Sequence, residues 1–307
     1  MSRTQVPATL GRPPVLDVGL LAVAVLAVST SGPLIAAIVA PALAISFWRS
    51  ILGALATVPL AWRERRTHRY RAPSRDRRLM LAAGLLLGAH FATWVPSLRY
   101  TSVASATALV ATQPIWAALL ARRAGVRIPP LAWFGIAVAF GGVLLLTGVD
   151  LAHDPATLLG DGLALLGGML AAAYVTVGER ARVRVPVHTY NTVVFAVAGL
   201  GLLVVCLIGR QPLLGYSARD WWLILALTAG AQLLGHSVVN RVLQTTSATV
   251  VSLAILFEVP GATLIAAWWL GQTPPLAVVP AVALLFAGLA VVIVSGTRRT
   301  PIETPPV

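Results

Sequence analysis

Long apolar stretches separated by short polar segments recur from the beginning of the chain to its end. A helix needs about 20 apolar residues to cross the hydrocarbon core of a bilayer, and the stretches have that length. The predicted spans are residues 16–37, 42–62, 79–98, 102–121, 131–149, 158–178, 189–209, 221–241, 247–270 and 276–295. These runs do not alternate between apolar and polar residues, which excludes a β-barrel. The pattern predicts an all-α integral membrane protein with ten transmembrane helices.

Composition agrees with this fold class. Hydrophobic residues make up 58% of the 307 residues and charged residues only 11%, whereas soluble domains carry about 25% charged residues. The single cysteine, Cys206, excludes an internal disulfide and a cysteine-based zinc cluster. We therefore predict no metal site and no other cofactor.

The net charge of +13 would suggest a nucleic-acid partner in a soluble protein. Here 19 of the 23 arginines fall in tails and loops on one side of the predicted spans, and eight of them lie between Arg63 and Arg78. The positive-inside rule then places both termini in the cytoplasm, with residues 1–15 and 296–307 as tails. The charge reports orientation in the plasma membrane and contact with anionic lipid headgroups, so no nucleic-acid partner is predicted.

The chain also contains a weak internal repeat. At an offset of about 145 residues, Gln113 falls on Glu258, and Asp17 falls on Asp161 at the start of each half. The further matches are Thr101-Ser102 with Thr246-Ser247, and Pro129-Pro130-Leu131-Ala132 with Pro274-Pro275-Leu276-Ala277. Residues 16–149 and 158–295 are therefore predicted to form two five-helix repeats. Because five is odd, the second repeat enters the membrane inverted, an arrangement typical of secondary transporters with a central site.

Short motifs in both halves point to a known family. They are Pro41-Ala-Leu-Ala-Ile-Ser-Phe-Trp-Arg49, Leu98-Arg-Tyr-Thr-Ser102 followed by Gln113-Pro114, Gly160-Asp161, and Glu258 followed by Pro260. With these motifs the chain resembles the ten-helix EamA-type members of the drug/metabolite transporter superfamily over essentially its whole length. Gln272 stands where that family often has a glutamate after the ninth helix. The resemblance implies the export or import of small metabolites.

Four polar residues lie at about one depth in four predicted spans. Glu258, His90, Gln113 and Gln232 are each about eleven residues into a span, or about 16 Å along a helix. Ionisable groups in hydrocarbon are costly, so Glu258 is the leading functional candidate. Spacings of four residues place further candidates on the same helix faces. The predicted substrate-binding or coupling residues are Glu258, His90, Trp94, Gln113, Trp116, Gln232, His236 and Asn240.

Each candidate also has a structural interpretation. The glutamines, Asn240 and the histidines can join helices by hydrogen bonds, and Trp94, Trp116 and Tyr174 can simply pack. Arg49 either reaches the interface along its own side chain or has a gating or structural role with an acidic partner. Pro114 and Pro260 either act as hinges or are tolerated within membrane helices. Asp17 and Asp161 are predicted to be helix N-terminal residues favoured by the helix dipole.

These features favour a secondary transporter that moves a small organic metabolite, such as an amino-acid-like or drug-like molecule, by alternating access. Proton coupling is a further hypothesis, because burial shifts carboxylate and histidine pKa values toward neutrality. A polytopic membrane enzyme acting on a lipid-like substrate is the alternative. Its only support is the neighbouring pair His153-Asp154, so we predict no catalytic residues. The expected partners are the metabolite and membrane lipids, while the substrate, the direction of transport and the oligomeric state stay open.

Overall fold

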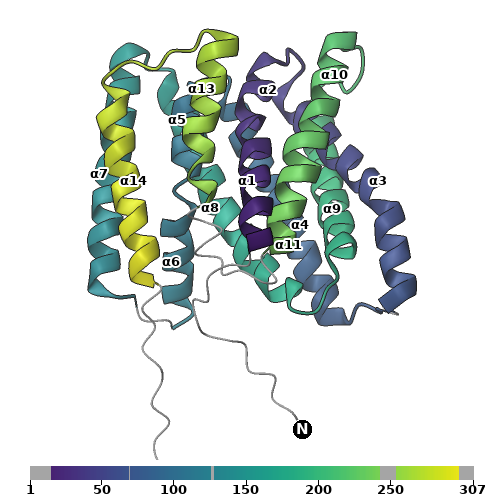
Figure 1. Cartoon of the computed structure of the whole chain (residues 1–307). Helices are drawn as coiled ribbons and strands as arrows, with labels where there is room; N and C mark the ends of the chain where they lie inside the picture. The colour runs from purple at the N-terminus through teal and green to yellow at the C-terminus, as the bar shows by residue number, and fades with distance from the viewer. Residues whose placement is uncertain (1–14, 69, 126–127, 243–253, 297–307) are drawn as a thin grey trace, which may run out of the picture.

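The computed structural model describes residues 15–68, 70–125, 128–242 and 254–296, and this part of the chain is helical without a strand. Figure 1 shows the helices side by side in a bundle. They are α1 (Val15–Ser29), α2 (Ser31–Ala37), α3 (Ala42–His68), α4 (Ser74–Ser97), α5 (Val103–Val110), α6 (Gln113–Arg123), α7 (Pro130–His153), α8 (Thr157–Arg182), α9 (Val187–Ile208), α10 (Ala218–Leu227), the π-helix η1 (Thr228–His236), α11 (Ser237–Val242), α13 (Glu258–Leu270) and α14 (Val278–Gly296). The predicted all-α fold is confirmed for these residues.

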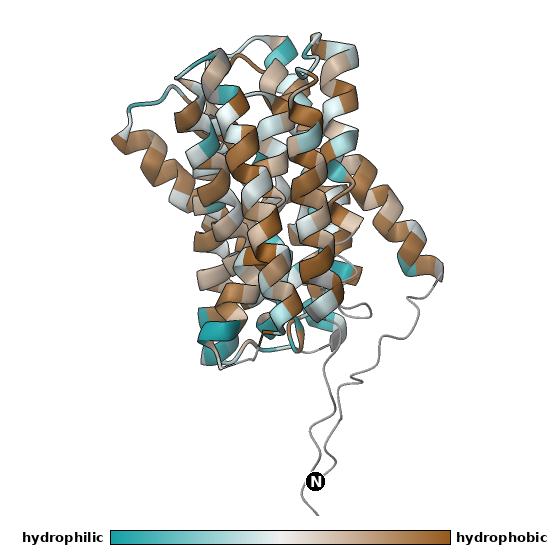
Figure 2. Cartoon of the chain, turned by 90° about the vertical axis from the view of Figure 1, so that its left-hand side faces the viewer, coloured by the Kyte–Doolittle hydropathy of each residue, from teal (hydrophilic) through white to brown (hydrophobic). Residues whose placement is uncertain are grey.

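Eight segments are long and apolar enough to cross a membrane, and they coincide with the first eight predicted spans. The tenth span corresponds to α14, whose apolar part, Val278–Val292, is shorter. The ninth, 247–270, is described only from residue 254 onward. The predicted tails lie almost entirely outside the described residues. Figure 2 shows hydrophobic residues along the helices and hydrophilic residues gathered toward their ends, as a bilayer environment requires.

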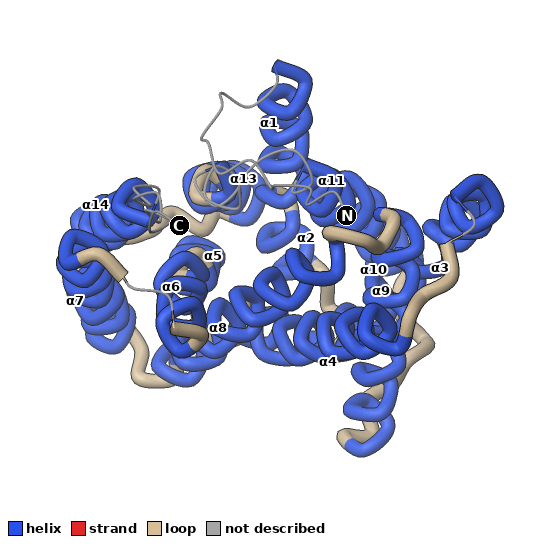
Figure 3. Tube along the Cα trace, turned by 90° about the horizontal axis from the view of Figure 1, so that it is seen from below, coloured by secondary structure: helices blue, strands red, loops and turns tan. Residues whose placement is uncertain are grey.

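The strongest packing joins helices that are far apart in sequence: α3 with α9, α4 with α8 and α9, and α7 with α14. Seen along the bundle, α7 and α14 lie at one side and α3 and α9 at the other (Figure 3). Glycines bring the backbones of α7 and α14 together. A Cβ added at Gly288 would lie 2.3 Å from the Ala139 nitrogen, and one at Gly142 would lie 2.5 Å from the Leu285 nitrogen. Small residues allow such close contact in membrane helices.

Two of the predicted spans are interrupted at equivalent places. α5 ends at Val110 and α6 begins at Gln113, while a turn at residues 256–257 precedes the start of α13 at Glu258. Gln113 and Glu258 are the residues that the internal repeat makes equivalent. The following prolines therefore lie in the first turn of a helix, where the missing N–H needs no partner. The sequence predicts an interruption at Pro114 and at Pro260, and in the structure each break lies a few residues earlier, with the helix restarting just before its proline.

Candidate functional site

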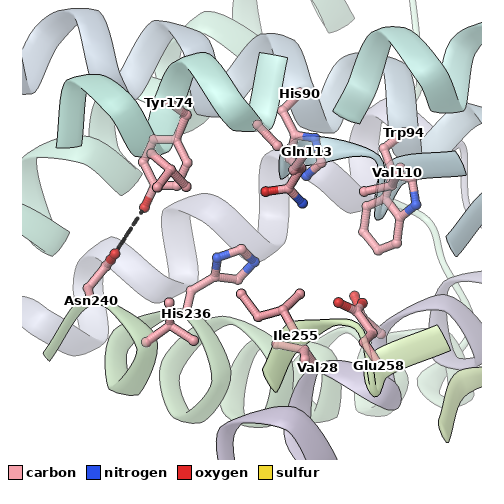
Figure 4. Close-up of a pocket in the computed structure, with 14 residues that line it drawn as sticks. Val28, His90, Trp94, Val110, Gln113, Tyr174, His236, Asn240, Ile255 and Glu258 are labelled. Carbon is pink, nitrogen blue, oxygen red and sulfur yellow. Dashed lines mark hydrogen bonds between the residues drawn. The ribbon is translucent and has the colours of Figure 1, made fainter. Parts of the chain in front are cut away.

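A cavity of about 80 Å³ lies between the helices near these two helix starts (Figure 4). Its walls come from α1, α2, α4, α5 and α6 of the first half and from α8, η1, α11 and α13 of the second half. The lining residues are Val28, Ser31, His90, Trp94, Val110, Gln113, Ala171, Tyr174, Val175, His236, Val239, Asn240, Ile255 and Glu258. The walls are mainly apolar, with polar groups at a few positions, as in small-molecule sites generally.

Six of the eight residues predicted for binding or coupling line this cavity, namely Glu258, His90, Trp94, Gln113, His236 and Asn240. Two do not. The Trp116 indole N–H donates to the Thr112 hydroxyl at 3.0 Å, so its side chain packs against its own helix. Gln232 is fully buried beside Arg49. The expectation that these two side chains face the same space as the others is wrong, because local hydrogen bonds direct them elsewhere.

His90 has a defined orientation. Its Nδ1 lies 2.9 Å from the Gly167 carbonyl oxygen. Because a carbonyl oxygen only accepts, Nδ1 carries the proton and the neutral ring keeps an acceptor lone pair on Nε2. The ring stacks on Trp94 with centroids 5.7 Å apart. The Trp94 indole nitrogen is buried without a hydrogen-bond partner among the described residues, so this wall offers one acceptor and one donor.

Glu258 faces this pair from the opposite wall. Figure 4 shows its carboxylate pointing into the cavity from the start of α13. Arg49 is the basic residue whose charge acts on this carboxylate.

Arg49 is buried with 0% exposure, so it does not reach the membrane interface. Its Nε donates to Gln232 Oε1 at 3.1 Å, and its guanidinium lies 4.2 Å from the centre of the Phe91 ring. Nη1 is 3.5 Å from the hydroxyl of Ser31, which itself lines the cavity. The residue thus ties α3 to α2, α4 and η1 directly behind the cavity wall.

A polar network joins α8, α9 and α11 toward the lower end of the bundle in Figure 1. Tyr174 and Asn240 are hydrogen-bonded to each other, and Asn240 Nδ2 also donates to Asn191 Oδ1 at 2.9 Å. Arg182 donates to the backbone carbonyls of Asn240 and Val185. Asn191 was not among the predicted site residues, although an amide inside an apolar stretch was a usable signal. Arg182 was assigned to a loop, whereas its side chain is only 4% exposed.

The opposite end is held by a second set of contacts around the short connection between α2 and α3. Arg99 donates to the carbonyls of Ile38 and Ala40 at 2.7 and 2.8 Å. Asp220 accepts from the Val39 N–H at 3.1 Å. Partial burial lowers the pKa of Arg99 from its usual value, and the Asp220 carboxylate opposes that shift. Polar contacts therefore join the helices toward both ends of the bundle.

Comparison with known proteins gives the family. A family model described as the EamA-like transporter family matches residues 17–148 and 158–294, that is, both predicted repeats. The chain belongs to the EamA-like transporter family. The resemblance inferred from the sequence motifs is thereby confirmed, and the chain is a multi-pass membrane transporter of the drug/metabolite transporter type.

The other comparisons concern the fold. A crystal structure with 19% sequence identity superposes with a TM-score of 0.64 and covers 93% of this chain and 99% of its own. At that identity the match shows a shared fold and nothing more. No curated protein matches the chain by sequence. The parts of this EamA-like chain that the structure describes contain no group of three or more His, Cys, Asp and Glu residues able to hold a metal ion.

Proposed function

We propose that this EamA-like protein is a secondary transporter that carries a small organic metabolite across the plasma membrane by alternating access between its two five-helix halves. The observation that carries the proposal is the cavity itself. It is lined from both halves, and two of its polar residues, Gln113 and Glu258, begin helices that restart at repeat-equivalent positions. Interrupted helices around a central site are the usual means by which transporters expose backbone groups and ligands.

The size of the cavity supports a mechanism with moving halves. Sites for small organic ligands usually enclose about 300–1,000 Å³, and this cavity encloses about 80 Å³. A metabolite therefore needs the surrounding helices to separate. The π-helix η1, which carries His236 at its last position, supports such movement because π-helical turns concentrate at functional sites.

The chemistry of the walls favours an amphipathic substrate with a cationic or hydrogen-bonding group. Glu258 supplies a carboxylate, His90 an acceptor nitrogen and Trp94 an indole N–H beside an aromatic face. An ammonium group can donate to the Glu258 carboxylate and to the free nitrogen of His90 and pack on the Trp94 ring, whereas the Trp94 indole N–H needs an acceptor oxygen elsewhere on the substrate. We also propose that Glu258 exchanges protons, because intramembrane carboxylates next to a cavity often carry protons in transporters. The excess of arginines on one side supports an orientation with both termini in the cytoplasm.

Uptake into proteoliposomes tests the proposal. A panel of radiolabelled amino acids and small amphipathic amines would be measured with and without an imposed pH gradient, in the wild type, in Glu258→Gln, and in the matched control Glu179→Gln. Glu179 is exposed near the end of α8. We expect gradient-driven uptake of at least one solute, lost in Glu258→Gln and kept in the control.

Three other outcomes would each contradict part of this proposal. Equal uptake in both variants would remove Glu258 from the mechanism. Uptake that ignores the pH gradient in every variant would remove proton coupling. Absence of uptake for the whole panel would contradict the substrate class.

A further inference from the structure

A second cavity, of about 240 Å³, lies beneath the connection between α13 and α14, at the end of the bundle that is uppermost in Figure 1. Its walls come from the start of α5, from α13 and from the connection that follows α13, and the residues are Ser102, Ala104, Thr263, Ala266 and 272–275. None of them lines the central cavity. The volume approaches the range of about 300–1,000 Å³ that is usual for small-molecule sites.

The two cavities lie on the same pair of helices. α5 and α13 pack against each other. Val110 and Glu258 line the central cavity, while Ala104 and Ala266 of the same two helices line the second one. These residues are six apart on α5 and eight apart on α13, or about 9–12 Å along a helix. Glu258, Ala262 and Ala266 share one face of α13, and Ala262, between the two cavities, is 0% exposed.

The walls of the second cavity are partly polar but carry no charge, because none of its lining residues is ionisable. The Thr263 hydroxyl donates to the Val259 carbonyl oxygen at 2.8 Å and can still accept a hydrogen bond. Gln272 Oε1 accepts from the Val103 N–H at 3.3 Å, and its amide nitrogen can donate two hydrogen bonds. A lipid chain cannot pair with these groups, whereas water and the hydroxyl or amide groups of a solute can.

α13 is bounded at both ends by a break in the helix. A turn at residues 256–257 precedes Glu258, and Gly271 follows the helix in the left-handed conformation, with a φ of 67°. Hinges lie at a few loop or element-terminal positions of this kind. On the face of α13 that passes from one cavity to the other, the side chains of Ala262 and Ala266 are single methyl groups. A small displacement of α13 away from α5 therefore joins the two cavities.

We propose that the second cavity is the outer vestibule of the transport path. It receives the uncharged hydrogen-bonding part of the solute, which then passes between α5 and α13 to the central cavity. This assignment rests on the proposed transport function and on the orientation that places both termini in the cytoplasm. It gives the vestibule a role in selecting solutes by hydrogen bonding, before the charged group of Glu258 is reached.

Thiol labelling of single-cysteine variants tests whether the vestibule is filled with water. The variants are made in a Cys206→Ser background, which removes the single native cysteine. A charged methanethiosulfonate reagent is added to open membrane fragments, so that both ends of the protein are reached. We expect Thr263→Cys to react at least about tenfold faster than Leu264→Cys, because the reactive thiolate forms in water and not in hydrocarbon. Leu264 is the matched control, since it follows Thr263 on α13 and is 70% exposed but does not line the cavity.

A second measurement tests the path between the cavities. Val110→Cys, in the central cavity, is labelled in sealed vesicles from the side that carries the connection between α13 and α14. Thr263→Trp fills the vestibule and should slow this labelling by about tenfold, which corresponds to a barrier higher by about 1.4 kcal/mol. Leu264→Trp, the matched control, should leave the rate unchanged.

The proposal is overturned if Thr263→Cys reacts no faster than Leu264→Cys, because lipid then fills the cavity. It is also overturned if Val110→Cys is labelled equally fast with and without Thr263→Trp, or if both tryptophans slow it equally, because access then does not depend on the vestibule. Should Thr263→Trp fail to fold, Thr263→Leu takes its place. Neither measurement uses a transported solute, so a failure here and a failure of the proposed transport function are distinguishable.

Discussion

Arg49 illustrates how single residues organise the wall behind the cavity. Its guanidinium is wholly buried and meets Gln232 and the face of Phe91. A planar guanidinium can donate to an amide oxygen and lie over an aromatic ring at the same time, which an ammonium group cannot do as well. Arg49 also acts on Glu258 through its charge. One side chain therefore influences both the packing of η1 and the electrostatics of the cavity.

A double-mutant cycle tests the pair Arg49 and Gln232. Arg49→Met leaves the Gln232 carbonyl oxygen buried without its donor, and Gln232→Met leaves the guanidinium short of an acceptor. Each change should lower the free energy of unfolding by about 1–3 kcal/mol. The double variant should lose less than the sum, because the two residues share one interaction. Denaturant unfolding in detergent measures this, with the exposed Arg63→Met as control, and strict additivity would contradict the coupling.

The packing of α7 against α14 depends on close contact between the two helix backbones at glycine positions. Gly288→Ala would place a methyl group 2.3 Å from the Ala139 nitrogen, so the helices must separate. Forcing atoms into packed space typically costs about 1–3 kcal/mol. The control is Gly162→Ala on α8, where a Cβ meets no atom within 4 Å. We expect a lower thermal midpoint for Gly288→Ala and an unchanged or higher one for Gly162→Ala; equal midpoints would contradict the close packing.

Tyr70, in the connection between α3 and α4, donates a hydrogen bond to Asp76, and this tether between the connection and α4 should respond to pH. Burial and a 2.9 Å hydrogen bond to Asp76 raise the pKa of Tyr70 to about 12. A raised pKa favours the protonated phenol in the folded protein, so the tether is intact below pH of about 10 and is lost between about 10 and 12. The difference in ultraviolet absorption between the wild type and Tyr70→Phe reports the ionisation of Tyr70, and it should show little tyrosinate up to a pH of about 11. In Asp76→Asn it should appear at a lower pH than in the wild type, because the hydrogen bond and the charge of Asp76 are lost while the burial of Tyr70 remains; the same onset in both would contradict the tether.

At this scale the sequence predicted the helices well and placed an interruption at Pro114 and at Pro260. Apolar length alone located the spans, because crossing a bilayer imposes that length. The exact restarts at Gln113 and Glu258 did not follow from the sequence, since the place of a helix break depends on what packs against the freed backbone groups. The direction of Gln232 was missed for the same reason, because its side chain is directed by Arg49. Arg99 and Arg182 were assigned to loops from hydropathy, while tertiary packing gives them carbonyl partners.

For the whole molecule, the two sets of polar contacts at the ends of the bundle act as the lower and upper closures of the cavity in the proposed mechanism. The lower closure shares Tyr174 and Asn240 with the cavity wall, so any movement of α11 that opens this end also reshapes the site. The upper closure is built differently, from Arg99 and Asp220 holding the connection between α2 and α3. Alternating access requires that one set of contacts be released while the other holds.

Releasing the upper closure gives the most direct test of this mechanism. Arg99→Gln removes two charge-assisted hydrogen bonds to Ile38 and Ala40, each worth about 1.5–3 kcal/mol. Loss of even one should raise the population of the open state by at least about tenfold. Cys206 is the single cysteine and is buried, so Cys206→Ser supplies a background in which Val110→Cys reports access to the cavity.

In that background, the rate at which a membrane-impermeant thiol reagent labels Val110→Cys from outside sealed vesicles should rise about tenfold with Arg99→Gln. Arg210→Gln is the matched control, because Arg210 lies in another loop on the same side and is exposed. Faster labelling with both variants would indicate that the substitutions loosen the helix bundle in general, and that the contacts of Arg99 have no specific part in closing this end. An unchanged rate with Arg99→Gln would mean that the contacts with Ile38 and Ala40 do not hold this end shut.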